Sequence, residues 1–174
     1  MAVARAMTND PTLRDRFLDA MSATACTVNI VTTDGTRGRA GVTVSAMSSI
    51  SADTDQPTLL VCVHHLSPAA DAILKNRAFC VNVLRDDQSI VADRFAGRVP
   101  AINGDKFAGS IWAPMASGVP RVVDPLAAFD CRLLSYQRVG THFVLVGAAD
   151  DIFVAGSGKP LVYARRAYAT AVPL

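Results

Sequence analysis

Two long runs of strand-forming residues in the C-terminal half are separated by a single glycine. The runs are LAAFDCRLLSYQRV (126–139) and THFVLVGAADDIFV (141–154), with Gly140 between them. Glycine readily adopts the backbone conformations of a tight turn, so the two runs are predicted to form a long hairpin. Hairpin strands are antiparallel, whereas parallel strands need long crossover connections. The chain is therefore expected to build an antiparallel sheet around this hairpin.

Further strand-like runs occur at hairpin spacing along the chain. CTVNIVTT (26–33) ends at the turn signal Asp34-Gly35, and RAGVTVSAMSSIS (39–51) is expected to return from that turn as its partner. Other strands are predicted at 57–65, 78–84 and 160–164, the last being the final strand after the turn GSGK (156–159).

Three helices are predicted between the strands. The first follows an N-cap at Asp10, has Pro11 at its first position and ends near Ser22. The second runs from Ser67-Pro68 to about Asn76, and the third occupies 86–97 with Gly97 as its stop. Residues 98–125 are rich in Gly and Pro and are predicted to be a loop. Inserted rather than alternating helices favour one small antiparallel barrel domain over residues 1–174, with 1–10 expected to be flexible.

Composition narrows the function classes. The formal charge of +2 is small and no Lys/Arg cluster concentrates it, so nucleic-acid binding is not expected. No apolar run is long enough to span a bilayer, and MAVARAMTNDP lacks the apolar core of a signal peptide. No membrane association and a cytoplasmic location are therefore expected. A hydrophobic content of 51% with 18% charged residues favours a dimer interface or a buried aromatic ligand.

Motifs for several common chemistries are missing from the sequence. The four cysteines form no C-x-x-C pair and are expected to be reduced, buried thiols, so no metal site is predicted. His64 and His65 are adjacent, and successive strand residues point to opposite faces, which argues against a two-histidine metal site. Neither the dinucleotide-binding G-x-G-x-x-G after a strand nor the P-loop occurs.

The stretch 39–51 has an unusual surface chemistry for a strand. It carries five small hydroxyl residues and no charge after Arg39. Such a strand is uncharged, polar and shallow, so a flat ligand with many hydrogen-bonding atoms could lie against it. The alternative interpretation is a Ser/Thr strand that faces water.

Several segments together identify a family resemblance. They are VTTDG, AGVTVSAMSSIS, FCVNVL, ADRFAG, DKFAG, FDC, GTHFVLVG and LVYARRAY, from about residue 14 to 170. In order and spacing the chain resembles the short-chain NAD(P)H:flavin oxidoreductases, which serve two-component monooxygenases. The resemblance implies a mainly β, antiparallel, Greek-key-like split barrel that binds flavin mononucleotide (FMN). It also implies a homodimer, FMN or FAD as flavin, and NADH or NADPH as hydride donor.

The resemblance also implies positions for the flavin. The isoalloxazine ring is expected along the hydroxyl-rich strand, at Thr43, Val44, Ser45, Ala46, Met47, Ser48, Ser49 and Ser51. Its phosphate end is expected near His64, His65, Ser67, Arg94, Phe95, Lys106 and Phe107. Asn82 is either a ligand contact or a strand asparagine with satisfied hydrogen bonds. His64-His65-Leu66 departs from the family, where many relatives carry Asn with Arg or Lys, and the turn ADTDQP (52–57) is longer than usual.

The resemblance implies positions for the nicotinamide as well. By resemblance His142 borders it as the candidate catalytic residue, and Leu161, Val162 and Tyr163 help to hold the pyridine nucleotide. For Tyr163 ordinary edge packing is an equal alternative. An NADPH 2′-phosphate would need an arginine, for which Arg132, Arg138, Arg165 and Arg166 are candidates.

Three functions remain open at this point. The first is an NAD(P)H:flavin oxidoreductase that supplies reduced flavin to a separate monooxygenase. The second is a flavoprotein that keeps its flavin and reduces another acceptor, such as a cobalt corrinoid. The third is a flavin-binding module without turnover.

Overall fold

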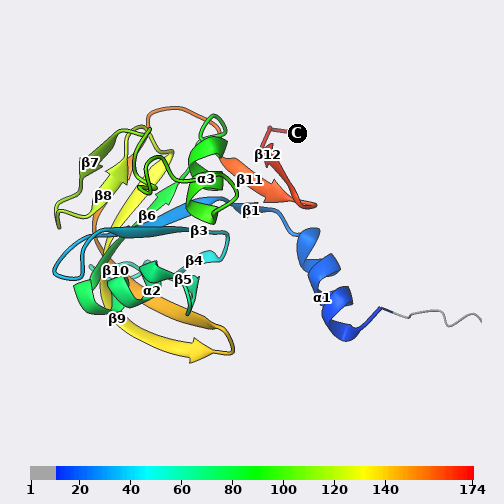
Figure 1. Cartoon of the computed structure of the whole chain (residues 1–174), viewed down its shortest axis with the longest axis horizontal. Helices are drawn as coiled ribbons and strands as arrows, with labels where there is room; N and C mark the ends of the chain where they lie inside the picture. Colours follow the sequence, from blue (N-terminus) through cyan, green and yellow to red (C-terminus); the bar gives the residue numbers. More distant parts are fainter. Residues whose placement is uncertain (1–10) are drawn as a thin grey trace, which may run out of the picture.

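The computed structural model describes residues 11–174 (Figure 1). The helices are α1 (Leu13–Ser22), α2 (Pro68–Asn76) and α3 (Ser89–Ala96). The strands are β1 (Cys26–Thr27), β2 (Asn29–Thr33), β3 (Ala40–Val44), β4 (Met47–Ser51), β5 (Thr58–His64), β6 (Ala78–Val83), β7 (Trp112–Pro114), β8 (Pro120–Val122), β9 (Ala127–Val139), β10 (His142–Val154), β11 (Leu161–Ala164) and β12 (Ala167–Thr170). The expected flexibility of 1–10 and the expected cap at Asp10 lie outside the described residues.

The main sheet is built around the predicted long hairpin. Its strand order is β3-β2-β6-β9-β10-β5-β4, and every pairing within it is antiparallel. β9 and β10 pair over almost their whole lengths, with Gly140 in the turn at a φ of 57°. The edge strand β3 also contacts β5, so the sheet curls toward closure. The predicted mainly β, antiparallel fold is confirmed.

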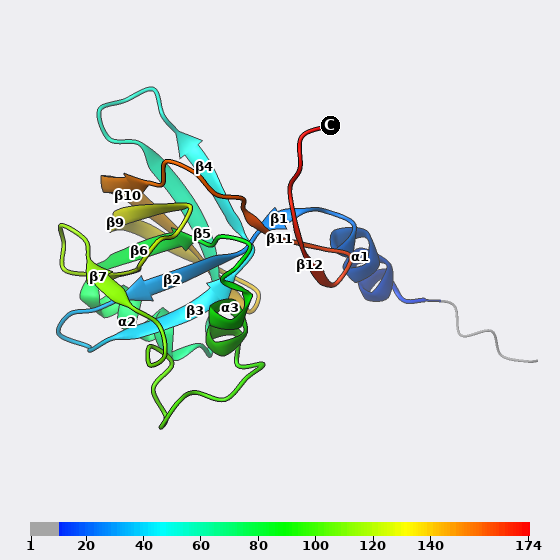
Figure 2. The same ribbon diagram turned by 90° about the horizontal axis from the view of Figure 1, so that it is seen from above.

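Two strand predictions were too long because each run changes partner. In 26–33 the chain leaves a small sheet of order β1-β11-β12 and enters the main sheet at Asn29. In 39–51 it turns at Ser45 and Ala46: β3 pairs with β2, whereas β4 pairs with β5 at the opposite edge (Figure 2). A period-two pattern indicates a strand but not its partner. β7, β8 and β12 are short and were not predicted, so 160–164 is not the final strand.

The helix starts also differ from the predictions. α1 begins after Pro11, because Thr12 and Asp15 form a reciprocal capping box around its first turn. α3 begins at Ser89 rather than near 86 and ends as predicted at Gly97, which is left-handed with a φ of 74°. α2 has the predicted Ser67 cap and Pro68 start. No described helix is long and apolar enough to cross a membrane.

α1 stands away from the barrel in both views (Figures 1 and 2). None of its residues is buried, although Leu13, Phe17 and Met21 recur on one face. These side chains are 79%, 62% and 48% exposed. The predicted amphipathic helix therefore exists, but its apolar face has no partner among the described residues.

The prediction of buried thiols holds for two of the four cysteines, whereas Cys26 and Cys62 are half-buried. Cys80 and Cys131 are 0% and 1% exposed, and all four thiols are free. Burial raises the pKa of the Cys131 thiol to about 12, and it raises the pKa of Cys80 as well. Cys62 is half-buried, and burial also raises its pKa.

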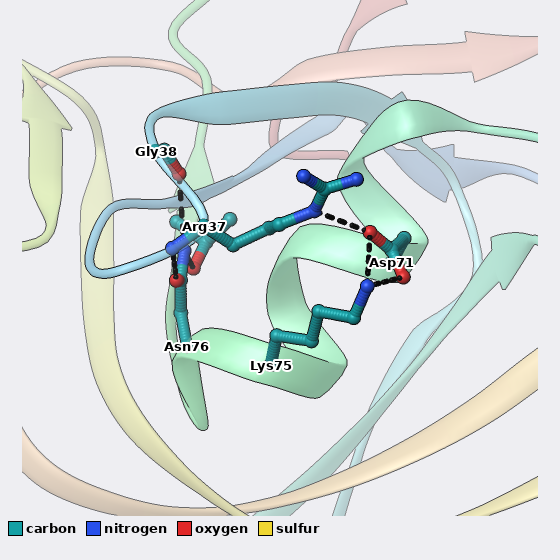
Figure 3. Close-up of polar contacts among 6 residues, drawn as sticks. Arg37, Gly38, Asp71, Lys75 and Asn76 are labelled. Atoms are coloured by element: carbon teal, nitrogen blue, oxygen red, sulfur yellow. Dashed lines mark hydrogen bonds and ion pairs between the residues drawn. The ribbon is translucent and has the colours of Figure 1, made fainter.

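Polar contacts fix the turn between β2 and β3 to α2 (Figure 3). The Asn76 side chain donates to the carbonyl of Gly38 and to Thr33 Oγ1, both at 3.1 Å, and accepts from the backbone N–H of Arg37 at 2.8 Å. On the outside, Asp71 pairs with Arg37 at 2.7 Å and with Lys75 at 2.9 Å. Exposed ion pairs contribute little, so Asn76 carries most of this attachment.

We expect Asn76→Ala to lower the free energy of unfolding by about 1–3 kcal/mol, because it removes three hydrogen bonds, one of them to the buried hydroxyl of Thr33. Asp71→Ala, which removes only exposed ion pairs, should cost less than about 1 kcal/mol. Urea denaturation of both variants measures the difference. Equal losses of unfolding free energy in the two variants would contradict the conclusion that Asn76 carries most of the attachment.

Candidate functional site

Three adjoining hollows follow the free edge of β3, and we call them together the β3 groove. The first is lined by residues 39–41 with Pro68 and residues 104–107, among them Asp105 and Lys106. The second is lined by residues 42–46 with Cys62, His64 and His142, and the third by residues 43–45 with Arg98, Tyr163 and Tyr168. Their empty volumes are about 560, 480 and 460 Å³ with the open solvent at their mouths included, so each hollow is shallow and open. The second and third hollows share residues 43–45.

The groove exists because β3 is paired on one side only. β2 occupies one edge of β3, and no strand of the main sheet pairs with the other. In an edge strand, alternate backbone N–H and C=O groups point away from the sheet and stay available. These groups can satisfy the rim of a flat polar ring that lies against the strand.

The hydroxyl-rich stretch is divided between two places. Residues 43–46 line the groove, but the hydroxyl of Thr43 donates to the carbonyl of Ala92 at 2.7 Å and so serves α3. Met47, Ser49 and Ser51 line a different, apolar hollow beside Phe129 and Ile152. Ser48 is exposed on β4. The structure therefore brings the first half of the stretch to the groove and not the second.

Three histidines lie at or beside the second hollow of the groove. The rings of His64 and His65 stack with centroids 4.9 Å apart, and the His142 ring lies 5.0 Å from that of His64. The expectation that His64 and His65 point to opposite faces was wrong, because β5 ends at His64 and the alternation no longer applies. Burial, followed by the charges of His65, His142 and Arg138, lowers the pKa of His64. The described residues contain no group of three or more His, Cys, Asp or Glu arranged to hold a metal ion.

The start of α2 has few free hydrogen-bond donors for an anion. Ser67 Oγ accepts from the N–H of Ala69 at 3.3 Å, and the Ser67 carbonyl accepts from the N–H of Ala70 at 2.9 Å. Pro68 has no N–H to give. The first-turn donors are thus used within the loop, which leaves side-chain cations as the more available partners for an anion.

Two cations line the hollow at the start of β3. Lys106 Nζ donates to the carbonyl of Phe95 at 3.2 Å, and the Arg39 guanidinium lies 4.3 Å from the centre of the Phe107 ring. Arg39 also pairs with Asp105 at 3.3 Å. Lys106 was predicted from the resemblance and Arg39 was not, although it is the charge that immediately precedes the hydroxyl-rich stretch.

Several predicted contacts lie in the interior. The amide of Asn82 donates to the carbonyl of Ile30 and accepts from the N–H of Val122, and the residue is 0% exposed. Phe95 is 1% exposed in an aromatic cluster with Phe107 and Trp112. Arg94 is 8% exposed and donates to the carbonyl of Ala108 at 2.8 Å. These side chains support the walls of the groove from behind.

A tyrosine–arginine group forms the wall of the third hollow. Tyr168 Oη donates to Asp93 at 2.7 Å, and the Arg98 guanidinium contacts Asp93 and Tyr168 at 3.3 Å and Tyr163 at 3.5 Å. Burial and then the hydrogen bond to Asp93 raise the pKa of Tyr168 to about 12. The sequence argument identified Tyr163 but missed Arg98 and Tyr168, which a loop and an unpredicted strand supply. Leu161 is 2% exposed and packs in the core, and Val162 pairs with Thr27 and Ala169.

Comparison with known proteins supplies the family. The family model of the flavin reductase like domain matches residues 21–171. FMN reductase (NADH) RutF 1 of Methylorubrum extorquens is 41% identical over 154 residues, which are 88% of this chain and 75% of that protein.

Two solved structures have the same fold. The nitrilotriacetate monooxygenase component B homolog from Mycobacterium thermoresistibile has a TM-score of 0.83 at 30% identity, over 92% of this chain and 87% of that one. BorF, the flavin reductase component of a bacterial two-component tryptophan halogenase, has a TM-score of 0.79 at 29% identity, over 89% and 96%. On these matches, and with a groove that suits a flat polar ring, the chain belongs to the flavin reductase like domain family.

Proposed function

We propose that the protein is an NAD(P)H:flavin oxidoreductase that transfers hydride from nicotinamide C4 to flavin N5. One observation carries the proposal: two hollows share residues 43–45, and one leads to His64 and His142 while the other leads to Arg98 and Tyr163. Two planar rings that enter from these two sides meet over the same backbone. Hydride transfer needs close, aligned rings and no acid–base pair, so the protein contributes mainly position.

We assign the parts of the groove as follows. The flavin ring lies against the backbone of residues 43–46, with its phosphate end toward Arg39 and Lys106. The nicotinamide enters beside Tyr163, with His142 across the shared backbone as the candidate catalytic residue. Arg39 and Lys106 support the phosphate assignment because both carry positive charge at the far hollow from the nicotinamide side.

The names of the relatives support a pair of cofactors and a partner for this protein. The name FMN reductase (NADH) supports FMN and NADH for this chain. The monooxygenase and halogenase components among its structural relatives support a separate oxygenase that receives reduced flavin. A cytoplasmic location stays a prediction.

Anaerobic titration of the purified protein with NADH or NADPH, in the presence of excess FMN or FAD, tests the function. We expect many equivalents of flavin to be bleached, fastest with FMN and NADH. Bleaching limited to one tightly bound equivalent would support a flavoprotein that reduces another acceptor. Flavin binding without bleaching would support a module without turnover, and absence of flavin binding would reject all three.

Arg98→Gln should raise the KM for NADH about tenfold or more while the Kd for FMN stays within twofold. Hydrogen bonds to charged groups are worth about 1.5–3 kcal/mol, and Arg98 faces the nicotinamide hollow with half of its side chain exposed. The matched control is Arg132→Gln, a similarly exposed arginine paired with Asp150 on the main sheet. Equal losses of NADH and FMN affinity would mean that Arg98 only supports the fold.

We also propose a homodimer in which α1 is covered by the second copy. Leu18 and Met21 line a hollow with Ser45 and Tyr163, so a copy that covers α1 would also close the nicotinamide side of the groove. Buried apolar area is the main source of stability in such an interface.

Phe17→Asp should therefore convert the particle from two chains of 18.4 kDa to one, as measured by light scattering after size exclusion. Phe17 is 62% exposed in the single chain, so the substitution should leave its fold intact. Arg16→Glu, which alters charge at a neighbouring exposed position of α1, should leave the mass unchanged. A single-chain mass for the unmodified protein would reject the homodimer.

A further inference from the structure

The hollow at the start of β3 contains a carboxylate beside the two cations assigned to the flavin phosphate. Asp105, which begins the segment DKFAG, lines this hollow together with Arg39 and Lys106. Asp105 Oδ2 lies 3.3 Å from Arg39 Nη2, and the two side chains are 46% and 43% exposed. A negative charge is thus already present where the negative charge of the ligand is expected.

Two hydrogen bonds hold Asp105 in the hollow without the help of Arg39. Its second carboxylate oxygen, Oδ1, accepts from the backbone N–H of Phe107 at 2.8 Å. Its own N–H donates to the carbonyl of Ile102 at 3.0 Å, across the tight turn that precedes it. The carboxylate therefore stays in the hollow when Arg39 turns to another anion.

Arg39 has a support other than the ion pair. Its guanidinium lies 4.3 Å from the centre of the Phe107 ring, and a guanidinium is attracted to the face of an aromatic ring. The Phe107 ring is 6% exposed and packs against Phe95 and Trp112. Trp112 Nε1 donates to the carbonyl of Phe107 at 2.9 Å and fixes this support from behind. Loss of the negative charge at Asp105 should therefore leave Arg39 beside the hollow.

A flavin phosphate would compete with Asp105 for Arg39. A phosphate monoester carries about −1.5 to −2 charges near neutral pH. Exposed ion pairs are weak, so the phosphate can displace the carboxylate from Arg39. Lys106 donates to the carbonyl of Phe95, and an ammonium has three N–H groups, so it can also donate to the phosphate. The displaced carboxylate, which cannot leave the hollow, then faces a group of its own charge.

We propose that Asp105 limits the affinity of the β3 groove for the flavin phosphate, because its fixed carboxylate repels the group that Arg39 and Lys106 attract. The inference rests on the proposed function and on its phosphate assignment. An enzyme that supplies reduced flavin to a separate protein must release it, and a moderate hold on the phosphate lets FMN leave. Asp105 thus determines how much affinity the groove gains from a phosphate on the flavin.

Titration of Asp105→Asn with FMN, and with riboflavin, which has no phosphate, tests the proposal. Asparagine removes the charge and keeps an oxygen that can accept from the N–H of Phe107. At low ionic strength we expect the Kd for FMN to fall about fivefold to tenfold, because a repulsion between close charges is lost. The Kd for riboflavin should stay within about twofold, since riboflavin brings no charge for the carboxylate to repel. Quenching of flavin fluorescence measures both constants.

Asp150→Asn is the matched control. Asp150 pairs with Arg132 at 3.4 Å, and the two side chains are 46% and 47% exposed. Asp150 lies on β10 and lines none of the three hollows of the groove. The same loss of charge at this position should leave the Kd for FMN and the Kd for riboflavin unchanged.

Salt concentration and two further variants complete the test. In about 0.5 M salt the gain of Asp105→Asn should shrink, because salt screens exposed charges. Asp105→Ser, whose hydroxyl can also accept from the N–H two residues on, replaces Asp105→Asn if that variant fails to fold. Arg39→Gln should raise the Kd for FMN and not the Kd for riboflavin, which locates the phosphate independently of Asp105.

Three results would overturn the inference while the proposed function stands. They are an unchanged or higher Kd for FMN in Asp105→Asn, an equal fall for FMN and riboflavin, and a gain that high salt does not reduce. A Kd for FMN that Arg39→Gln leaves unchanged would overturn the inference together with the phosphate assignment. Absence of any flavin binding by the unmodified protein would overturn the proposed function as well.

Discussion

The site depends on one constraint, that β3 hydrogen-bonds to a neighbour along only one of its edges. A free strand edge usually invites another strand and is a hazard for association. Here the edge is recessed: α2 and α3 both contact β3, and the hydroxyl of Thr43 ties the strand to α3. A flat ring can reach the free backbone groups, whereas the flanking helices obstruct an incoming strand. Asn76 holds the other end of β3 by fixing the turn before it, so the groove is set by contacts outside its own lining.

Much of the fold could be predicted from local pattern. Gly140 between two long apolar runs, and Asp34-Gly35 between two shorter ones, indicate hairpins because turn chemistry and strand period are properties of neighbouring residues. A change of strand partner, in contrast, is not determined by neighbouring residues alone. The breaks at Val28 and at Ser45-Ala46 arise because each run passes from one neighbour to another, and no residue there is a strong breaker.

The same distinction between local pattern and tertiary structure explains which site residues could be predicted from the sequence. Residues 43–46 and Tyr163 could be chosen from sequence because each lies in a segment with a recognisable pattern. Arg98, Tyr168 and Arg39 could not, since a side chain in a loop or at a strand end reaches the groove only through tertiary structure. Phe95 was expected at the ligand but is 1% exposed. For Asn82, which is 0% exposed, the alternative of a strand asparagine with satisfied hydrogen bonds fits the structure. A sequence motif indicates that a residue matters at its position. It does not show whether the side chain contacts the ligand or packs behind the residues that do.

Burial of the thiols protects them from an oxidant that the product of a flavin reductase can generate. Reduced flavin that escapes into air reacts with oxygen and generates hydrogen peroxide, and peroxide oxidises cysteine through the thiolate. Cys80 and Cys131 are closed off from solvent, and burial keeps both protonated. The half-buried Cys62, which lines the groove, is likewise kept in its less reactive form. The barrel interior thus shields two of the four thiols from the oxidant that escaping reduced flavin generates.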